Sequence, residues 1–393
     1  MEYMIQGFKA SAVAAGLKQN GAPDLALIYS EKESTAAGVF TTSRVKAAPV
    51  LLSMEHIRKG KARAIVANAG NANACTGSQG LDDARGTIDR VSQILGIDST
   101  DVLVASTGVI GKPLDMALLS NAMPELQENL GSKGMQDVAR AIMTTDTFPK
   151  ISAYGGMAGG RPYRIVGVAK GSGMIMPDMA TMLCFLLSDI AIDGPSLQKT
   201  LLCGVQKTFN RITVDGDTST NDTVFMLANG MAGNGALSDP DLKEFDAGLA
   251  KVMGDLARMI IKDGEGATKF VALEIKGAAS ASDALKGART VANSPLVKTA
   301  FYGSDPNWGR MMAALGRSGI LFEESNTDIW IDDVQIVKGG LGCGPDAERR
   351  AAQKMSGDAF TVSVQLGAGE FSETVYTCDL SHDYVTINAN YRT

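Results

Sequence analysis

The chain has 393 residues, of which 45% are hydrophobic and 20% charged, and its net charge is −6 at neutral pH. This length predicts two or three modest domains or one large layered unit, and the negative charge, with no basic cluster, argues against a nucleic-acid-binding protein. The five scattered cysteines favour a reduced, cytoplasmic protein. Two histidines argue against a histidine-rich metal site, and no apolar run approaches the roughly 20 residues that span a membrane.

The first part of the sequence predicts short strands joined by glycine turns, followed by helices. Apolar and β-branched runs bounded by turn residues are typical of strands, whereas apolar residues on one stripe at helical spacing indicate a helix. We expect strands at 25–30, 36–42, 62–70 and 101–107, and helices at 81–95, 114–130 and 134–144. A strand at 163–173 runs into a glycine-rich segment.

The second part mixes strands and helices in blocks. We expect strands at 182–192, 222–229, 269–277, 330–337 and 360–367, and helices at 195–209, 239–264 and 282–293. Because the blocks do not alternate regularly, they predict an α+β protein rather than a doubly wound parallel sheet.

The segment KGSGMIMPDMATM at 170–182 contains a candidate nucleophile, Thr181. If Thr181 cut the peptide bond after Ala180, it would free its own α-amine, so that hydroxyl and base would lie on one residue. An α-amine titrates near pH ~8 and a lysine near ~10.4. Lys170 would therefore need a pKa lowered by about 3 units to serve as the base at neutral pH. The simpler interpretation is a threonine that begins a strand.

Other polar motifs also leave alternatives open. The turn STGVIG at 106–111 offers donors for an oxyanion hole, or is an ordinary turn. The segment around Lys170 lacks the residue order of a phosphate loop. This favours a role for Lys170 in an ion pair with a substrate carboxylate. Glu265, between glycines, either holds an ammonium group or is a solvated loop carboxylate. The acidic run 215–222 lacks the glycine and glutamate of a calcium loop.

Taken together, these segments resemble the ornithine acetyltransferases, also called glutamate N-acetyltransferases, of the cyclic arginine pathway. The similarity covers almost the whole chain, and its motifs occur in the family's order. They lie at 7–18, 36–50, 66–77, 105–111, 144–150, 170–183, 211–222, 264–269, 293–310 and 390–393.

The resemblance implies a self-cleaving precursor. The cut would fall between Ala180 and Thr181, giving an α chain of residues 1–180 and a β chain of residues 181–393. The implied fold is a layered α/β/β/α-type sandwich, shared with self-cleaving aminopeptidases, with a smaller C-terminal α/β lobe from about residue 280. The two chains would assemble as an α2β2 heterotetramer.

The resemblance also implies the chemistry. An acetyl group moves from N2-acetylornithine to glutamate through an acetyl-threonine, which releases ornithine and N-acetylglutamate. Thr181 is the nucleophile, and Thr107 and Gly108 are the oxyanion donors. The substrate-binding residues implied are Thr144, Lys170, Thr181, Glu265, Asn388 and Thr393. No metal or bound cofactor is expected, while acetyl-CoA is left open as a second acetyl donor.

Two other classes of protein remain as alternatives. A self-cleaving aminopeptidase or amidase would share the threonine and the fold but would pass the acyl group to water. A non-enzymatic amino-acid-binding protein would keep its chain intact. Neither alternative requires nucleic acid or a membrane.

Overall fold

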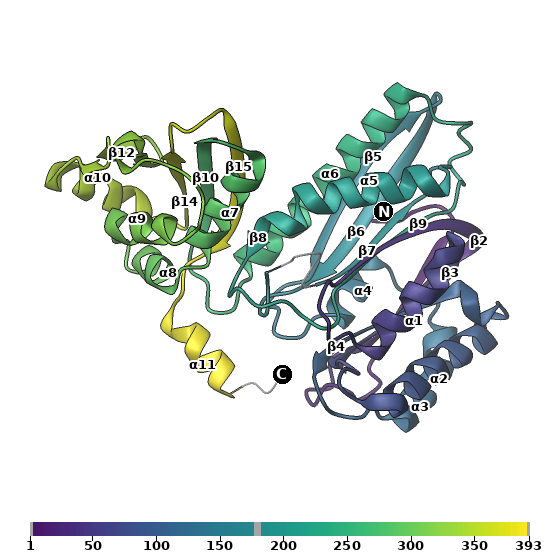
Figure 1. The fold of residues 1–393 in the computed structure, drawn as a ribbon. Coiled ribbons are helices and arrows are strands. Elements are labelled where there is room, and N and C mark those ends of the chain that lie inside the picture. Colours follow the sequence, from purple (N-terminus) through teal and green to yellow (C-terminus); the bar gives the residue numbers. More distant parts are fainter. Residues whose placement is uncertain (1–2, 177–181, 391–393) are drawn as a thin grey trace. The chain divides into compact units, whose positions relative to one another are not determined.

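The computed structural model describes residues 3–176 and 182–390, and these form two compact units (Figure 1). The first unit comprises the described residues up to Asn210 together with Asp217–Ile260. The second comprises Arg211–Gly216 and the described residues from Ile261 onward. The C-terminal lobe that we expected begins at about residue 280. No helix within the two described ranges is long and apolar enough to cross a membrane.

The first unit contains an eight-stranded sheet and most of the long helices (Figure 1). Its strands are β1 (Phe8–Val13), β2 (Leu25–Phe40), β3 (Lys61–Asn71), β4 (Val102–Val109), β5 (Lys150–Ala158), β6 (Arg161–Lys170), β7 (Leu183–Ser188) and β9 (Thr223–Ala228). Its helices are α1 (Ala48–His56), α2 (Gly77–Leu95), α3 (Met116–Glu128), α4 (Met135–Ala141), α5 (Gly194–Lys207) and α6 (Asp239–Lys262). The strand order is β4-β3-β2-β9-β7-β6-β5, and β1 pairs with β2.

Strand β7 lies near the middle of this sheet, which explains its sequence. It pairs parallel with β9 and antiparallel with β6, and all six of its residues are buried. A strand covered on both faces reads as a continuous apolar run rather than as an alternating one. The run LCFLLS therefore matches the core strand predicted there, although the strand ends at Ser188 rather than at residue 192.

The sheet folds over on itself. Strands β4 and β6 are separated by four other strands, which in a flat sheet would place them about 24 Å apart. Nevertheless, Lys170 Nζ at the end of β6 lies 3.3 Å from Thr107 Oγ1 near the end of β4. A lysine's four-carbon stem cannot cover the flat-sheet distance, so the two halves of the sheet face each other.

The helices complete a layered arrangement around this folded sheet. One face of β2, β3 and β4 packs against α1, α2 and α3 through residues such as Leu27, Val66 and Val104. The opposite face shares a core with β6, β7 and β9, to which Ile65, Val168 and Phe185 contribute. Gly167 faces away from this core, and a side chain there would meet Val252 and Leu256 of α6. The expected α+β class is confirmed.

The second unit contains a seven-stranded sheet and five helices among its described residues (Figure 1). Its strands are β8 (Ile212–Thr213), β10 (Phe270–Ala278), β11 (Asp328–Ile331), β12 (Val334–Lys338), β13 (Leu341–Gly342), β14 (Ala359–Gln365) and β15 (Phe371–Cys378), in the order β13-β12-β11-β14-β10-β15-β8. Its helices are α7 (Ala281–Ala292), α8 (Pro295–Tyr302), α9 (Trp308–Gly316), α10 (Pro345–Met355) and α11 (His382–Asn390). Alternate residues of β10 and β14 are buried against helices, as expected for a sheet packed on one face.

Two of the predicted strand boundaries are wrong. The runs 25–30 and 36–42 belong to one 16-residue strand, β2, whose pairing with β3 shifts register between Tyr29 and Ser34. The run 330–337 is a hairpin rather than one strand, because the chain turns at Asp332, which has a positive φ of 50°. An aspartate tolerates this left-handed conformation better than most residues.

Candidate active site

Two of the predicted site residues, Thr144 and Thr107, converge on the ammonium group of a third, Lys170. Lys170 Nζ donates a hydrogen bond to Thr144 Oγ1 at 2.8 Å and another to Thr107 Oγ1 at 3.3 Å. The three residues lie at the end of β6, in the segment between α4 and β5, and on β4. Lys170 is only 8% exposed, so its charge acts in a medium that screens it less than water does.

Gly108, the residue after Thr107, packs directly against the neighbouring strand. Its φ is +132°, and a β-carbon there would lie 2.3 Å from the carbonyl carbon of Gly70. The pairing of β3 with β4 is irregular at Gly70 and Asn71. Glycine is therefore required for both its backbone angle and its lack of a side chain. This irregular pairing lies where the sequence predicts an oxyanion turn.

Buried amide groups hold this strand end in place. Asn221 Nδ2 donates to the carbonyl oxygens of Ser106 at 2.8 Å and Ala72 at 2.6 Å. The hydroxyl of Ser106 donates to Asn68 Oδ1 at 2.5 Å. Buried polar groups that are satisfied in this way rigidify their surroundings. The acidic run 215–222, which lacks the residues of a calcium loop, thus supplies Asn221 to support the strand end that carries Thr107.

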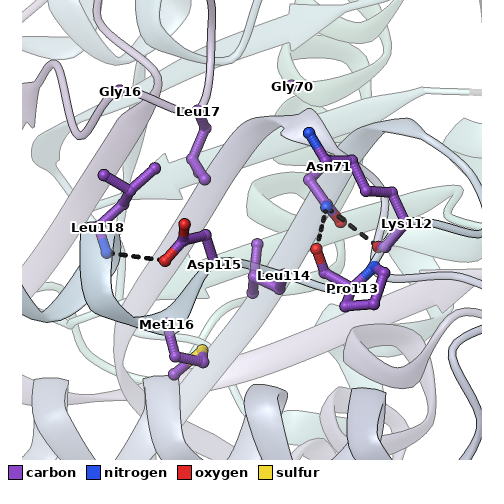
Figure 2. Close-up of a pocket in the computed structure, with 10 residues that line it drawn as sticks. All are labelled: Gly16, Leu17, Gly70, Asn71, Lys112, Pro113, Leu114, Asp115, Met116 and Leu118. Atoms are coloured by element: carbon purple, nitrogen blue, oxygen red, sulfur yellow. Dashed lines mark hydrogen bonds between the residues drawn. The ribbon is translucent and has the colours of Figure 1, made fainter.

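A pocket of about 430 Å³ borders the end of β3, the strand that pairs with β4 (Figure 2). Asn71 lines it and donates to the carbonyl oxygens of Lys112 and Pro113, each at 3.1 Å. Opposite, Asp115 caps α3 by accepting from the N–H groups of Ala117 and Leu118. Among the residues that line the pocket are the positively charged Lys112 and the negatively charged Asp115.

The chain leading to the predicted cleavage position is anchored at two points, Ser172 and Met176. Ser172 Oγ lies 2.7 Å from Thr145 Oγ1, and the N–H of Met176 donates to the carbonyl oxygen of Asp217 at 2.9 Å. Met174 has a positive φ of 55°, which is strained for a residue with a side chain. Ala180 and Thr181 lie outside the described residues.

The second unit brings together two other predicted residues. Asn388 Nδ2, on α11, donates to Glu265 Oε2 at 2.8 Å, and Glu265 is only 8% exposed. Gly266 allows this approach, because a β-carbon there would lie 2.4 Å from the backbone nitrogen of Tyr384. The C-terminal helix is therefore docked on the GEGATK loop. Thr393 lies outside the described residues.

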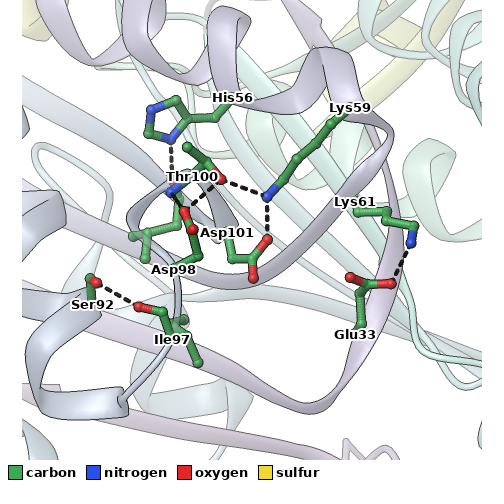
Figure 3. Close-up of polar contacts among 10 residues, drawn as sticks. Glu33, His56, Lys59, Lys61, Ser92, Ile97, Asp98, Thr100 and Asp101 are labelled. Atoms are coloured by element: carbon green, nitrogen blue, oxygen red, sulfur yellow. Dashed lines mark hydrogen bonds and ion pairs between the residues drawn. The ribbon is translucent and has the colours of Figure 1, made fainter.

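Histidine takes no part in the cluster around Lys170 within the described residues. His56 Nδ1 lies 2.9 Å from the carbonyl oxygen of Val102, at the other end of β4 from Thr107, next to the Lys59–Asp101 ion pair (Figure 3). His382 lies in the second unit against the ring of Tyr302. The described residues also hold no group of three or more His, Cys, Asp or Glu side chains that could bind a metal ion.

Sequence reasoning missed one charged residue beside Lys170. Asp146 accepts hydrogen bonds from the N–H groups of Thr144 at 2.9 Å and Gly171 at 2.7 Å. The available signal was the motif TTDTFPK, which places a lone carboxylate among threonines beside a predicted substrate residue.

Comparison with known proteins decides the family. A family model described as the ArgJ family matches residues 9–393. The chain belongs to the ArgJ family. It is 52% identical over 391 residues to a Geobacter sulfurreducens protein named arginine biosynthesis bifunctional protein ArgJ, covering 99% of this chain and 100% of that one. A Syntrophotalea carbinolica protein of the same name is 47% identical over 392 residues, with 99% of each chain covered.

A solved ArgJ structure is also similar. The crystal structure of the arginine biosynthesis bifunctional protein argJ from Bacillus halodurans is 42% identical, with a TM-score of 0.50. The match covers 52% of this chain and 96% of that one. The resemblance expected from the motifs is confirmed, and with it the assignment of this ArgJ family member to the acetyltransferases of arginine biosynthesis.

Proposed function

We propose that this chain transfers the acetyl group of N2-acetylornithine to glutamate, releasing ornithine and N-acetylglutamate. The observation that carries the proposal is the convergence of Lys170, Thr144 and Thr107 at hydrogen-bond distance. In an ArgJ family member, this arrangement provides the cation of Lys170 for a substrate carboxylate. The hydroxyl of Thr107 and its strand end, which are suited to binding an oxyanion, lie next to that cation.

The proposed mechanism is a two-step acyl transfer. The α-amine of Thr181 takes the proton of the Thr181 hydroxyl as Oγ attacks the acetyl carbonyl, and Thr107 and Gly108 bind the oxyanion. The amide bond breaks, the proton passes to the leaving nitrogen, and ornithine departs. The amine of glutamate then attacks the acetyl-threonine ester, which restores the hydroxyl.

In this proposal the remaining substrate contacts divide by charge. Lys170 pairs with a carboxylate, and Glu265 holds an ammonium group. Thr144, Asn388 and Thr393 supply further polar contacts. A single acetyl-threonine then serves two amino acids whose side chains differ in charge.

Self-cleavage between Ala180 and Thr181 is part of the same proposal. It is supported by the Bacillus halodurans structure, because 52% of this chain accounts for 96% of that one. A chain of little more than half the length is what a cut near the middle of a precursor would give. Intact-mass measurement of the purified protein tests the cut, since an uncut chain has a mass of 41.1 kDa.

The test of transfer uses N2-acetylornithine with labelled acetyl. With glutamate present, we expect equal amounts of ornithine and labelled N-acetylglutamate. Without glutamate, we expect ornithine release to stop at about one equivalent of enzyme, as ping-pong chemistry requires. Continuous release of labelled acetate without glutamate would instead favour the amidase alternative.

We further propose acetyl-CoA as a second acetyl donor, with no bound cofactor. The word bifunctional in the names of the relatives supports this extension. Incubation with glutamate and acetyl-CoA, without N2-acetylornithine, should then form N-acetylglutamate. We also propose a cytoplasmic α2β2 assembly, for which light scattering should give about twice the mass of one precursor.

A further inference from the structure

Asp146 and Lys150 form a buried ion pair beside the candidate active site. Lys150 Nζ lies 2.6 Å from Asp146 Oδ1, and neither side chain is exposed to solvent. Lys150 begins β5, where it pairs with Ala169, the residue before Lys170. A fully buried pair is costly to desolvate and is weak grounds for stability by itself, so its place in the fold needs another explanation.

The carboxylate of Asp146 holds the backbone on both sides of the Lys170–Thr144 contact. Oδ2 accepts from the N–H of Thr144 at 2.9 Å, and Oδ1 accepts from the N–H of Gly171 at 2.7 Å. Thr144 supplies the hydroxyl that accepts from Lys170 Nζ, and Gly171 directly follows Lys170. One carboxylate thus fixes the two chain segments whose side chains meet.

The charge of Asp146 is strongly maintained. Burial of the carboxyl group favours its neutral form, but the ammonium groups of Lys170 and Lys150 and the Gly171 N–H outweigh burial. Together they lower the pKa of Asp146 to about 2. The group is therefore an anion at neutral pH, and its opposite charges are the buried Lys150 and the candidate substrate-binding Lys170.

We propose that Asp146, with Lys150 as its counter-ion, is a positioning residue that holds Lys170 and Thr144 in the geometry that binds the substrate carboxylate. The inference rests on the proposed function, since it assigns Lys170 to that carboxylate. Lys150 neutralises the single negative charge of the Asp146 carboxylate, while that carboxylate fixes the backbone beside Lys170 and Thr144. Without the anchor, the Lys170 side chain would lose its fixed partner Thr144 and its attraction for substrate would weaken.

Three variants separate positioning from simple structural support: Asp146→Asn, Lys150→Met and the double variant. Each single change leaves a buried charge without its partner, which lowers Tm whichever role is correct. The double variant removes both charges together, so its Tm should recover. Positioning predicts that its KM for N2-acetylornithine stays raised about tenfold or more, with a smaller change in kcat. Recovery of both Tm and KM would overturn the proposal.

Asp146→Glu provides an independent test that keeps the charge. Its carboxylate is displaced by one methylene, so the N–H groups of Thr144 and Gly171 lose their fitted acceptor. We expect a raised KM for both N2-acetylornithine and glutamate. Wild-type KM values in a folded Asp146→Glu protein would show that charge alone is needed and would refute the positioning role.

The pair Lys251 and Asp255 on α6, whose side chains are 56% and 28% exposed, is the control, because it has the same residue types at the same spacing of four. Neutralising it in a double variant should leave both KM values unchanged. The outcome is also distinct from failure of the proposed function. If the wild-type protein transfers no acetyl group, the function is wrong, whereas normal transfer with unaltered KM in the Asp146 variants refutes only the positioning role.

Discussion

The side-chain amide of Asn388 donates to the carboxylate of Glu265 at 2.8 Å, although the two residues are 123 positions apart. The contact fixes the orientation of a carboxylate that is 8% exposed. Glu265→Gln keeps the size and the contact but removes the charge that the proposed function assigns to an ammonium group. We expect the KM for N2-acetylornithine to rise about tenfold or more.

Steady-state kinetics checks this prediction, with Glu370→Gln as the control because Glu370 is an exposed glutamate of the same unit. The control should match the wild-type protein. An unchanged KM in Glu265→Gln would remove Glu265 from the substrate site.

Thr181→Ala should yield one uncut chain without acetyl transfer, because the change removes the hydroxyl needed for both reactions. Thr181→Ser is the matched control, since it retains a hydroxyl and would free an α-amine after cleavage. Intact mass and the transfer assay check both variants. Two chains from the alanine variant would contradict the proposed cleavage chemistry.

Gly108→Ala should destabilise the first unit more than Gly111→Ala does. Both glycines have positive φ, 132° and 77°, so both substitutions carry backbone strain of about 1 kcal/mol. Only at position 108 would the new β-carbon meet backbone, 2.3 Å from the Gly70 carbonyl carbon, whereas nothing lies within 4 Å at position 111. The clash should add about 1–3 kcal/mol, seen as a larger fall in Tm. Equal falls would show that the strands separate readily there.

The lowered pKa of Lys18 predicts how the stability of the protein depends on pH. Burial lowers the pKa of Lys18 from 10.5 to about 8, an effect that Asp24 and Asp146 oppose and Lys170 reinforces. Between about pH 8 and 10, the unfolded chain therefore binds more protons at this residue than the folded chain. The Lys18 contribution to the free energy of unfolding consequently increases as the pH rises through this window.

Denaturant titrations at pH 8 and pH 10 check this effect. The change in stability with pH should be more favourable for the wild-type protein than for Lys18→Met. Lys133→Met is the control, because Lys133 is exposed. Identical pH dependence in the wild-type protein and Lys18→Met would contradict a lowered pKa.

The local elements were the most predictable part of the fold. Apolar spacing indicated α2, and Ala84, Ile88 and Val91, which belong to the predicted apolar stripe, are buried. The polar residues at 31–34 hid the continuity of β2, because a bulge that shifts register leaves no simple pattern in sequence. The turn at Asp332 was hidden within an otherwise strand-like run for a similar reason.

The candidate site was predictable only as separate motifs. Thr107 and Lys170 were selected individually, but their 3.3 Å contact depends on how the whole sheet bends. Asp146 was missed because its importance comes from backbone N–H groups, which every sequence contains. Roles for Ala180, Thr181 and Thr393 stay predictions, because these residues lie outside the described ranges.

The order β2-β9-β7-β6 has a consequence for the fate of the two cleavage products. Strands β2 and β6 precede residue 180 and strands β9 and β7 follow it, yet β9 and β7 lie between the other two. A nick after residue 180 would leave the halves interlaced, with each outer strand still bonded to a strand from the other half. The fragments should co-elute under native conditions and come apart only in denaturant.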